Sequence, residues 1–287
     1  MGIDVHGLNF LRYASRKQPL GKVATIGRQA LAISPISLAR IMGSRISSNL
    51  FCEGFLVKHL GATVVESFDF SHYEGATYVV DMNEPIQPPR EYDTVIDFGC
   101  VEHIYNAPQA LKNVSMLCAV GGQIIHVLPA NNFCGHGFWQ FSPELFFSLY
   151  CEGNGYGDTE VFLAELRKSS RWFEVIKPSG GKRAQVTSRC PLYVMCRTIK
   201  TSLVSHNSVQ QSDYIVAWDN ASKAELHSGG AFATVRKIIS KSSFLNVLLT
   251  SAYRSIRETA NGLRNPTTLS SRNRHLKKRE VRKLLAN

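Results

Sequence analysis

Residues 91–129 decide the fold, and they read EYDTVIDFGCVEHIYNAPQALKNVSMLCAVGGQIIHVLP. The β-branched run 94–96 predicts a short buried strand. The strand stops at the polar, glycine-containing turn 97–100, and a helix is expected from about residue 106 to residue 119. Asn106 can cap this helix, and its apolar residues recur on one face, which predicts that the helix packs on a sheet.

A glycine pair and a second strand follow the predicted helix. Gly121 and Gly122 are expected to end the helix, because glycine adopts the left-handed conformation at little cost. Residues 123–128 then form a strand, which Pro129 closes. A strand, a helix and a second strand make a βαβ unit, and this crossover implies parallel strands in one sheet. The stretch therefore predicts an α/β fold.

Four segments of the sequence carry a family resemblance. They are YDTVI at 92–96, VEHI at 101–104, GGQIIHVLP at 121–129 and FSPE at 141–144. Together they resemble the middle of a class I S-adenosylmethionine (SAM) dependent methyltransferase of the type 11-like group, over roughly residues 20–200. The resemblance implies a Rossmann-like, mostly parallel seven-stranded sheet flanked by helices, with SAM as the cofactor. It also implies methyl transfer to an oxygen or nitrogen of a polar small molecule or glycan.

Segments outside the βαβ unit complete the predicted sheet. Residues 21–30 hold the first strand and its loop, residues 62–71 the second strand, and residues 74–85 the third strand and its loop. Residues 160–167 read as a short helix. Two final strands, close to residues 172–176 and 191–199, are expected to pair antiparallel, as the family topology implies.

The loop after the first strand departs from the family pattern. There the family has an acidic residue followed by Gly-x-Gly-x-Gly, because glycines let backbone N–H groups approach a nucleotide-type ligand. This chain has Thr25 at the acidic position and then Gly27, Arg28, Gln29 and Ala30. Gly27 and Arg28 are candidate cofactor-binding residues, and Arg28 either contacts the cofactor carboxylate or fills the cofactor's space.

Acidic residues follow the next strands at the edge where open α/β sheets bind ligands. A carboxylate at the tip of the second strand suits both ribose hydroxyls, because each of its oxygens accepts hydrogen bonds. The resemblance implies that Asp69 is this residue, since Asp-x-Ser after the strand matches the family pattern, and Glu66 is the alternative. The resemblance implies that Asp81 lies near the adenine amino group and that Met82 contacts the ring. For Asp69 and for Glu66, the structural alternative is that the side chain caps a loop.

The turn after the fourth strand holds further candidates. The resemblance places Gly99 and Glu102 beside cofactor and acceptor. His103 and His136 are candidate general bases, because an unperturbed imidazole has a pKa near neutrality. His103 is alternatively a structural residue that pins the loop, and His126 is expected to be a core histidine with satisfied hydrogen bonds.

The aromatic, amide-rich loop 131–141 is expected to overhang the acceptor pocket. It contains Cys134 two residues before His136, but two ligands do not define a metal site, so no metal is expected.

Composition bounds the domain organisation. The chain has 287 residues, 44% of them hydrophobic, which suits one large α/β domain with an extension. We expect a methyltransferase-like domain at 1–200, a Ser-, Asn- and Gln-rich linker at 201–232 and a basic helical extension at 233–287. No stretch approaches the roughly 18 consecutive apolar residues of a membrane span. The seven cysteines include no Cys-x-x-Cys pair, so a cytoplasmic protein with reduced thiols is expected.

The positive charge of the chain lies in its C-terminal extension. From residue 231 onward there are 13 Lys or Arg and two Glu. The net charge of this segment is therefore +11, which equals the net charge of the whole chain. Five apolar residues of this segment fall on one helical face: Leu245, Leu248, Leu249, Ala252 and Ile256. Such a helix docks on the domain, or contacts an anionic membrane surface or nucleic acid. Peripheral membrane association is therefore an alternative to a purely cytoplasmic location.

Two other functions compete with small-molecule methyl transfer. The incomplete glycine loop favours a catalytically inactive methyltransferase fold that acts as a binding or scaffold protein. The basic extension favours a nucleic-acid methyltransferase, although no Asn-Pro-Pro-Tyr-type motif accompanies it.

Overall fold

The computed structural model describes residues 2–46, 50–204, 209–226, 251 and 267–286. The helices are α1 (Val5–Lys17), α2 (Pro35–Met42), α3 (Glu53–Leu60), α4 (Ala107–Leu117), α5 (Pro143–Leu149), α6 (Ser212–Leu226) and α9 (Val281–Leu284), with single 3-10 turns η1 (Val101–His103) and η2 (Glu152–Asn154). The strands are β1 (Gly2–Ile3), β2 (Gly21–Ile26), β3 (Ala30–Leu31), β4 (Ala62–Asp69), β5 (Tyr78–Val79), β6 (Tyr92–Phe98), β7 (Cys118–Asn131), β8 (Tyr156–Glu165), β9 (Arg171–Val175), β10 (Leu192–Lys200) and β11 (Leu276–Glu280).

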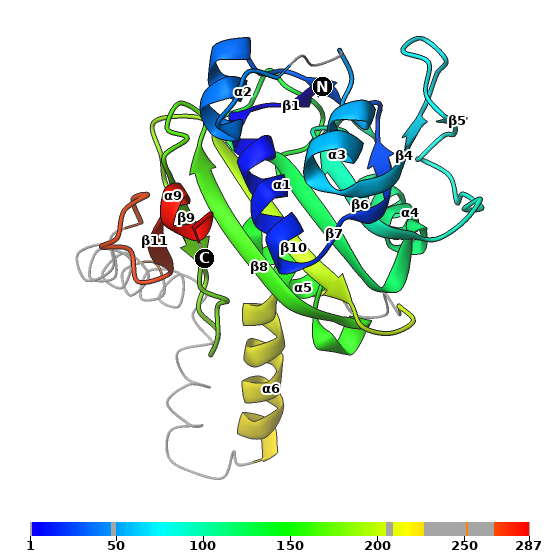
Figure 1. Cartoon of the computed structure of the whole chain (residues 1–287). Helices are drawn as coiled ribbons and strands as arrows, with labels where there is room; N and C mark the ends of the chain where they lie inside the picture. Colours follow the sequence, from blue (N-terminus) through cyan, green and yellow to red (C-terminus); the bar gives the residue numbers. More distant parts are fainter. Residues whose placement is uncertain (1, 47–49, 205–208, 227–250, 252–266, 287) are drawn as a thin grey trace.

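One large sheet organises the molecule (Figure 1). Its strand order is β11-β9-β8-β10-β7-β6-β2-β4-β5. The half from β7 to β5 is parallel, and the half from β10 to β11 is antiparallel. Strands β1 and β3 form a separate two-stranded parallel pair. This is the predicted Rossmann-like α/β fold, but the sheet has nine strands in place of seven, and half of its strand pairings are antiparallel, whereas a mostly parallel sheet was expected.

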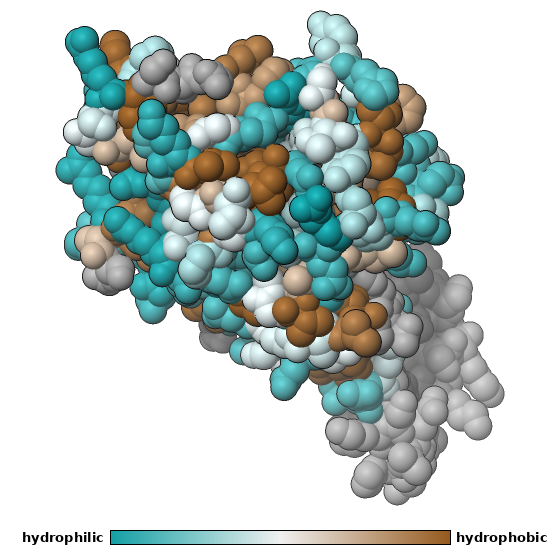
Figure 2. All heavy atoms as spheres, turned by 45° about the vertical axis from the view of Figure 1, so that its right-hand side comes forward, coloured by the Kyte–Doolittle hydropathy of each residue, from teal (hydrophilic) through white to brown (hydrophobic). Residues whose placement is uncertain are grey.

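Helices cover both faces of the sheet (Figure 1). One apolar core contains residues of α4 and α5, and the other contains residues of α1, α2 and α3. The inner parallel strands β2, β6 and β7 each contain a run of consecutive buried residues, as expected of strands covered on both faces, whereas the outer strands β4 and β5 are more exposed. On the surface, apolar patches lie among hydrophilic ones on the side of α4 and β5 (Figure 2). None of the helices in the described part of the chain is long and apolar enough to span a bilayer.

The helix predicted at residues 160–167 is wrong, because residues 160–165 belong to strand β8 and residues 166–167 to the turn after it. Its residues 161–165 are all buried, so the sequence shows a continuous apolar run rather than an alternation. Such a run does not distinguish a buried helix from a buried strand. The predicted pairing of the last two strands is wrong for the same reason, since β8 lies between β9 and β10 and pairs with both.

The predicted end of the central helix is also wrong. Asn106 caps α4 as expected, accepting a hydrogen bond from the Gln109 backbone N–H at 3.4 Å. The helix ends at Leu117, and β7 begins at the next residue, before the glycine pair. Gly121 has a φ of +85° and lies where the register between β6 and β7 shifts. It therefore forms an irregularity inside a strand, a position that favours glycine.

The C-terminal region differs from the expectation of a loop followed by a basic helix. Helix α6 lies in the segment 201–232 that was expected to be linker, and it extends away from the sheet (Figure 1). Within 233–287, the described residues form strand β11, which pairs antiparallel with β9, and the short helix α9. The predicted amphipathic face at residues 245–256 lies outside the described residues.

Candidate functional site

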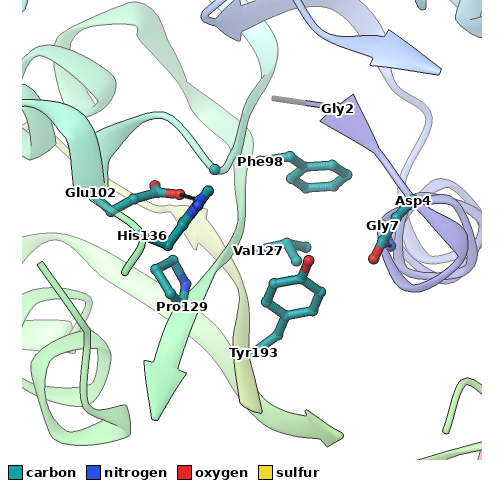
Figure 3. Close-up of a pocket in the computed structure, with 10 residues that line it drawn as sticks. Gly2, Asp4, Gly7, Phe98, Glu102, Val127, Pro129, His136 and Tyr193 are labelled. Carbon is teal, nitrogen blue, oxygen red and sulfur yellow. Dashed lines mark hydrogen bonds and ion pairs between the residues drawn. The ribbon is translucent and has the colours of Figure 1, made fainter. Parts of the chain in front are cut away.

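A cavity of about 150 Å³ opens beside the carboxyl ends of β6 and β7 (Figure 3). Parallel strands bring ligand-binding loops to this edge. Helix α1 forms the opposite wall and approaches closely at Gly7, where a Cβ would lie 3.0 Å from Phe98 Cδ2. The cavity is lined by Gly2, Asp4, Gly7, Phe98, Gly99, Glu102, Val127, Pro129, His136 and Tyr193.

The turn that carries Glu102 is held by a buried aspartate. Asp97 Oδ1 accepts hydrogen bonds from the backbone N–H groups of Cys100 and Val101, at 3.2 and 3.3 Å. Gly99 has a φ of +78°, a conformation that favours glycine at this bend. The chain then forms the 3-10 turn η1, which directs the Glu102 side chain toward the cavity (Figure 3).

Glu102 is a buried carboxylate without a hydrogen bond. It is 1% exposed, and neither carboxylate oxygen has a hydrogen-bond partner among the described residues. Burial, followed by the nearby charge of Asp97, raises the pKa of Glu102 to about 8. Burial disfavours the charged form of an isolated carboxylate. Near neutral pH, Glu102 can therefore take up or release a proton, or bind a cation.

Both predicted bases lie at this carboxylate. Glu102 Oε1 is 3.4 Å from His136 Nε2 and 3.7 Å from His103 Nε2. The two imidazole rings are 4.9 Å apart between centroids and nearly perpendicular. Burial, followed by the charge of His136, lowers the pKa of His103. The structure thus brings together three of the residues selected from the sequence.

The loop 133–141 is fastened to the Glu102 turn by its backbone. The N–H groups of Phe138 and Trp139 donate to the Glu102 carbonyl, at 2.7 and 3.2 Å. Gly137 has a φ of +70°, and a Cβ there would lie 2.8 Å from Glu102 Cγ. The loop lies against the turn and holds His136 beside Glu102.

The loop after β2 is closed by its own hydrogen bonds. Gly27 donates its N–H to the Phe68 carbonyl at 2.7 Å. Asp69 accepts from the N–H of Arg28 at 3.0 Å and from the N–H of Phe70 at 2.7 Å. At Ala30 the chain enters the short strand β3. Each Asp69 oxygen still has acceptor capacity, because a carboxylate oxygen has two lone pairs.

The Arg28 side chain is fully engaged. Its Nε lies 2.7 Å from Glu53 Oε1, and its guanidinium stacks 4.0 Å from the centroid of the Phe51 ring. The same group donates to the Glu74 carbonyl. A Cβ at Gly75 would lie 2.9 Å from Arg28 Nη1. Arg28 therefore occupies the space beside Asp69, between the end of β2 and the loop after β4.

The remaining cofactor candidates are separated from the cavity. Asp81 accepts hydrogen bonds from the backbone N–H and side-chain amide of Asn83, at 2.9 and 2.8 Å. Met82 is 5% exposed and packs in the core, so its side chain is covered. Glu66 lies within β4 and accepts from the Tyr92 hydroxyl at 2.7 Å. Glu66 is thus a structural residue, and Asp69 is the acidic residue at the strand end.

His126 is the satisfied core histidine that was expected. Its Nδ1 lies 2.8 Å from Asp97 Oδ2, its Nε2 lies 2.6 Å from the Tyr150 hydroxyl, and the side chain is fully buried. This pair of contacts fixes the imidazole between two neighbours, which is a structural role.

Sequence reasoning missed the two other polar side chains that line the cavity, Asp4 and Tyr193. Asp4 caps α1 by accepting from the Gly7 N–H at 2.8 Å, and it faces the cavity from the wall opposite Glu102 (Figure 3). Tyr193 projects from β10, and burial together with Asp4 raises its pKa. A capping aspartate before a helix was visible in the sequence, but nothing local indicated which strand ends that helix would cover.

Comparison with known proteins returns solved structures only. No protein-family model and no curated protein matches the chain. The N-methyltransferase NodS from Bradyrhizobium japonicum is 11% identical, with 69% of this chain and 94% of that chain covered and a TM-score of 0.41. A SAM-dependent methyltransferase from Thermotoga maritima is 15% identical, with 68% and 91% covered and a TM-score of 0.34. A sugar N-methyltransferase from Streptoalloteichus is 14% identical, with 74% and 76% covered and a TM-score of 0.28. The fold assignment above rests on the strand order and pairing of this chain itself.

Proposed function

We propose that this protein is a SAM-dependent methyltransferase that acts on an oxygen or nitrogen of a polar small molecule or glycan. The observation that carries the proposal is the position of Asp69 at the carboxyl end of β4, on the sheet edge that also holds the Glu102 cavity. An acidic side chain at this edge suits the ribose of an adenosine cofactor, and the neighbouring cavity suits the group that accepts the methyl.

The residues present have definite roles in such a reaction. Bound SAM would supply an electrophilic methyl group. Asp69 retains acceptor capacity for ribose hydroxyls beside its two backbone hydrogen bonds. The cavity walls would hold the acceptor in line, which is an effect of proximity and orientation. Glu102, with His103 and His136, lies where a proton leaving the acceptor can be taken up.

Arg28 favours a second candidate function, the inactive fold that binds a partner. In its present contacts with Glu53, Phe51 and Glu74, the side chain fills space beside Asp69. Under the enzyme proposal, Arg28 leaves the Glu74 carbonyl and pairs with the carboxylate of the cofactor. Under the scaffold proposal, it stays and excludes the cofactor.

Calorimetric titration of SAM and S-adenosylhomocysteine tests the enzyme proposal. We expect micromolar binding to the full chain and its loss in Asp69→Ala, because the ribose contact is removed. Asp219→Asn, on an exposed position of α6, is the matched control and should bind as the unmodified chain does. Thermal unfolding of each variant confirms that it is folded. Absence of binding at millimolar ligand would exclude the enzyme proposal.

An Arg28→Ala variant separates the two proposals in the same titration. If Arg28 contacts the cofactor carboxylate, its removal weakens SAM binding, since a charge-assisted hydrogen bond is lost. If Arg28 blocks the site, its removal creates or strengthens SAM binding. The second result would support the scaffold function for the natural chain.

An anionic partner for the basic extension stays a prediction. Peripheral membrane binding and nucleic-acid binding both depend on Lys and Arg residues that lie largely outside the described part of the chain. A steep loss of RNA or DNA binding with rising salt would favour the nucleic-acid methyltransferase.

A further inference from the structure

We propose that Glu102, His103 and His136 form a binding site for one divalent transition-metal ion. Two imidazoles and one carboxylate are a ligand set that suits zinc, iron, cobalt and nickel, with positions left open for a substrate or water. Calcium and magnesium prefer oxygen ligands and fit this set poorly.

The distances between the ligand atoms support the site. One ligand atom from each residue lies within 4.8 Å of the other two. Glu102 Oε1 is 3.4 Å from His136 Nε2 and 3.7 Å from His103 Nε2. Ligands of one zinc-like ion, each at about 2.1 Å from it, lie roughly 3 to 3.5 Å apart. Small rotations of two partly exposed imidazoles would complete this geometry.

The burial of Glu102 points to a cation independently of these distances. Both carboxylate oxygens are buried and have no hydrogen-bond partner among the described residues. A buried carboxylate in that state is costly unless it is protonated, paired or bound to a metal. His103 and His136 both lie within ion-pair distance of Glu102, and their imidazole nitrogens are metal ligands as well as potential cations. An ion bound between the three side chains would provide the missing partner of the carboxylate.

The backbone holds the ligands in place before any ion arrives. His103 donates its N–H to the Cys100 carbonyl at 2.9 Å within η1. His136 donates its N–H to the Phe133 carbonyl at 2.9 Å, and the following residues bond to the Glu102 carbonyl. Two segments distant in sequence are thus fixed against each other, which is the preorganisation that a metal site needs.

The site is open on one side. The side chains of His103 and His136 are 39% and 50% exposed, and Glu102 and His136 also line the cavity. An ion here would therefore have coordination positions that face solvent and the cavity. The inference does not depend on SAM binding, because the three ligands are separate from Asp69 and Arg28.

The test uses the full chain, without a histidine tag and stripped of metal. Cobalt(II) is titrated and followed by its visible absorption, and zinc(II) is titrated by calorimetry, both without SAM. We expect one ion per chain. Glu102→Gln and His136→Asn should each weaken binding by at least about 100-fold, because loss of a direct ligand exceeds the 10- to 100-fold typical of outer-shell changes.

Two control variants locate the ion. His72→Asn changes an exposed histidine on another loop, and Cys134→Ser changes an exposed thiol close to His136. Both should bind as the unmodified chain does. Thermal unfolding checks that every variant is folded, and Glu102→Gln preserves the side-chain volume. Absence of stoichiometric binding, binding unaffected by both ligand variants, or loss of binding in Cys134→Ser would overturn the proposal.

Discussion

Two carboxylates of the same turn have opposite environments. Asp97 accepts hydrogen bonds from two backbone N–H groups and contacts His126, whereas neither oxygen of Glu102 has a hydrogen-bond partner among the described residues. Asp97 is thus a structural anchor, and its charge adds to the burial that raises the pKa of Glu102. Of the two residues, Glu102 is therefore the better candidate for proton transfer or for binding a cation.

The Asp97–His126–Tyr150 contacts give a prediction on stability. Tyr150→Phe removes the hydroxyl that lies 2.6 Å from His126 Nε2 and leaves a buried nitrogen unpaired. We expect the free energy of unfolding to fall by about 1–3 kcal/mol, the cost of a buried polar group without its partner. Urea unfolding followed by circular dichroism measures the change.

The control for this prediction is Tyr105→Phe. Tyr105 is 76% exposed, so loss of its hydroxyl should leave the free energy of unfolding unchanged within about 0.5 kcal/mol. Equal stability of the two variants would show that the hydroxyl of Tyr150 contributes nothing to the core.

At the scale of elements, the site is the junction of a turn and a loop. The turn η1 follows β6, and the loop 133–141 follows β7, so neighbouring parallel strands deliver them to one edge of the sheet. Backbone hydrogen bonds to the Glu102 carbonyl join the two. The geometry of the junction therefore depends on how closely the loop approaches Glu102.

Gly137→Ala tests that approach. The residue has a φ of +70°, and a Cβ would lie 2.8 Å from both Cγ and the carbonyl oxygen of Glu102. We expect the variant to lose about 1–3 kcal/mol of stability, from left-handed backbone strain and the clash. Gly135→Ala in the same loop is the control, since a Cβ there meets nothing within 4 Å. A melting temperature that falls equally in both variants would contradict this account.

At the scale of the whole molecule, the C-terminal segment completes the domain. Strand β11 adds the last strand to the antiparallel half, and Leu276 and Val281 are buried in the two cores. The Val281 N–H also donates to the Ser170 carbonyl at 3.1 Å. The end of the chain is therefore part of the packed fold, beyond its role as a source of positive charge.

Leu276→Ala measures this contribution. The side chain is 5% exposed, so its truncation should lower the free energy of unfolding by about 2–5 kcal/mol through lost burial and a cavity. Leu203→Ala, at a position that is 84% exposed, serves as the control and should change little. If Leu276→Ala is as stable as the control, β11 does not help to hold the sheet together.

The sequence alone determined the parallel half of the sheet and the residues at its edge. The strand, turn and helix of residues 91–129 were predictable because β-branched runs, a capping Asn106 and helical periodicity act over short distances. Asp69 and the Glu102 turn were selected through the family resemblance, together with the rule that ligands meet the carboxyl ends of parallel strands. Those features depend on local sequence patterns and on the order in which strands and helices follow one another along the chain.

Only the tertiary structure decided which distant groups meet. Residues 160–165 become part of strand β8 because β9 and β10 pair with that strand on its two sides, which the local sequence cannot specify. Arg28 finds Glu53, Phe51 and Glu74, and Glu102 finds His136, through contacts between segments separated by loops. These contacts form only when strands, helices and loops from distant parts of the chain pack against one another. No single stretch of sequence specifies how closely they pack.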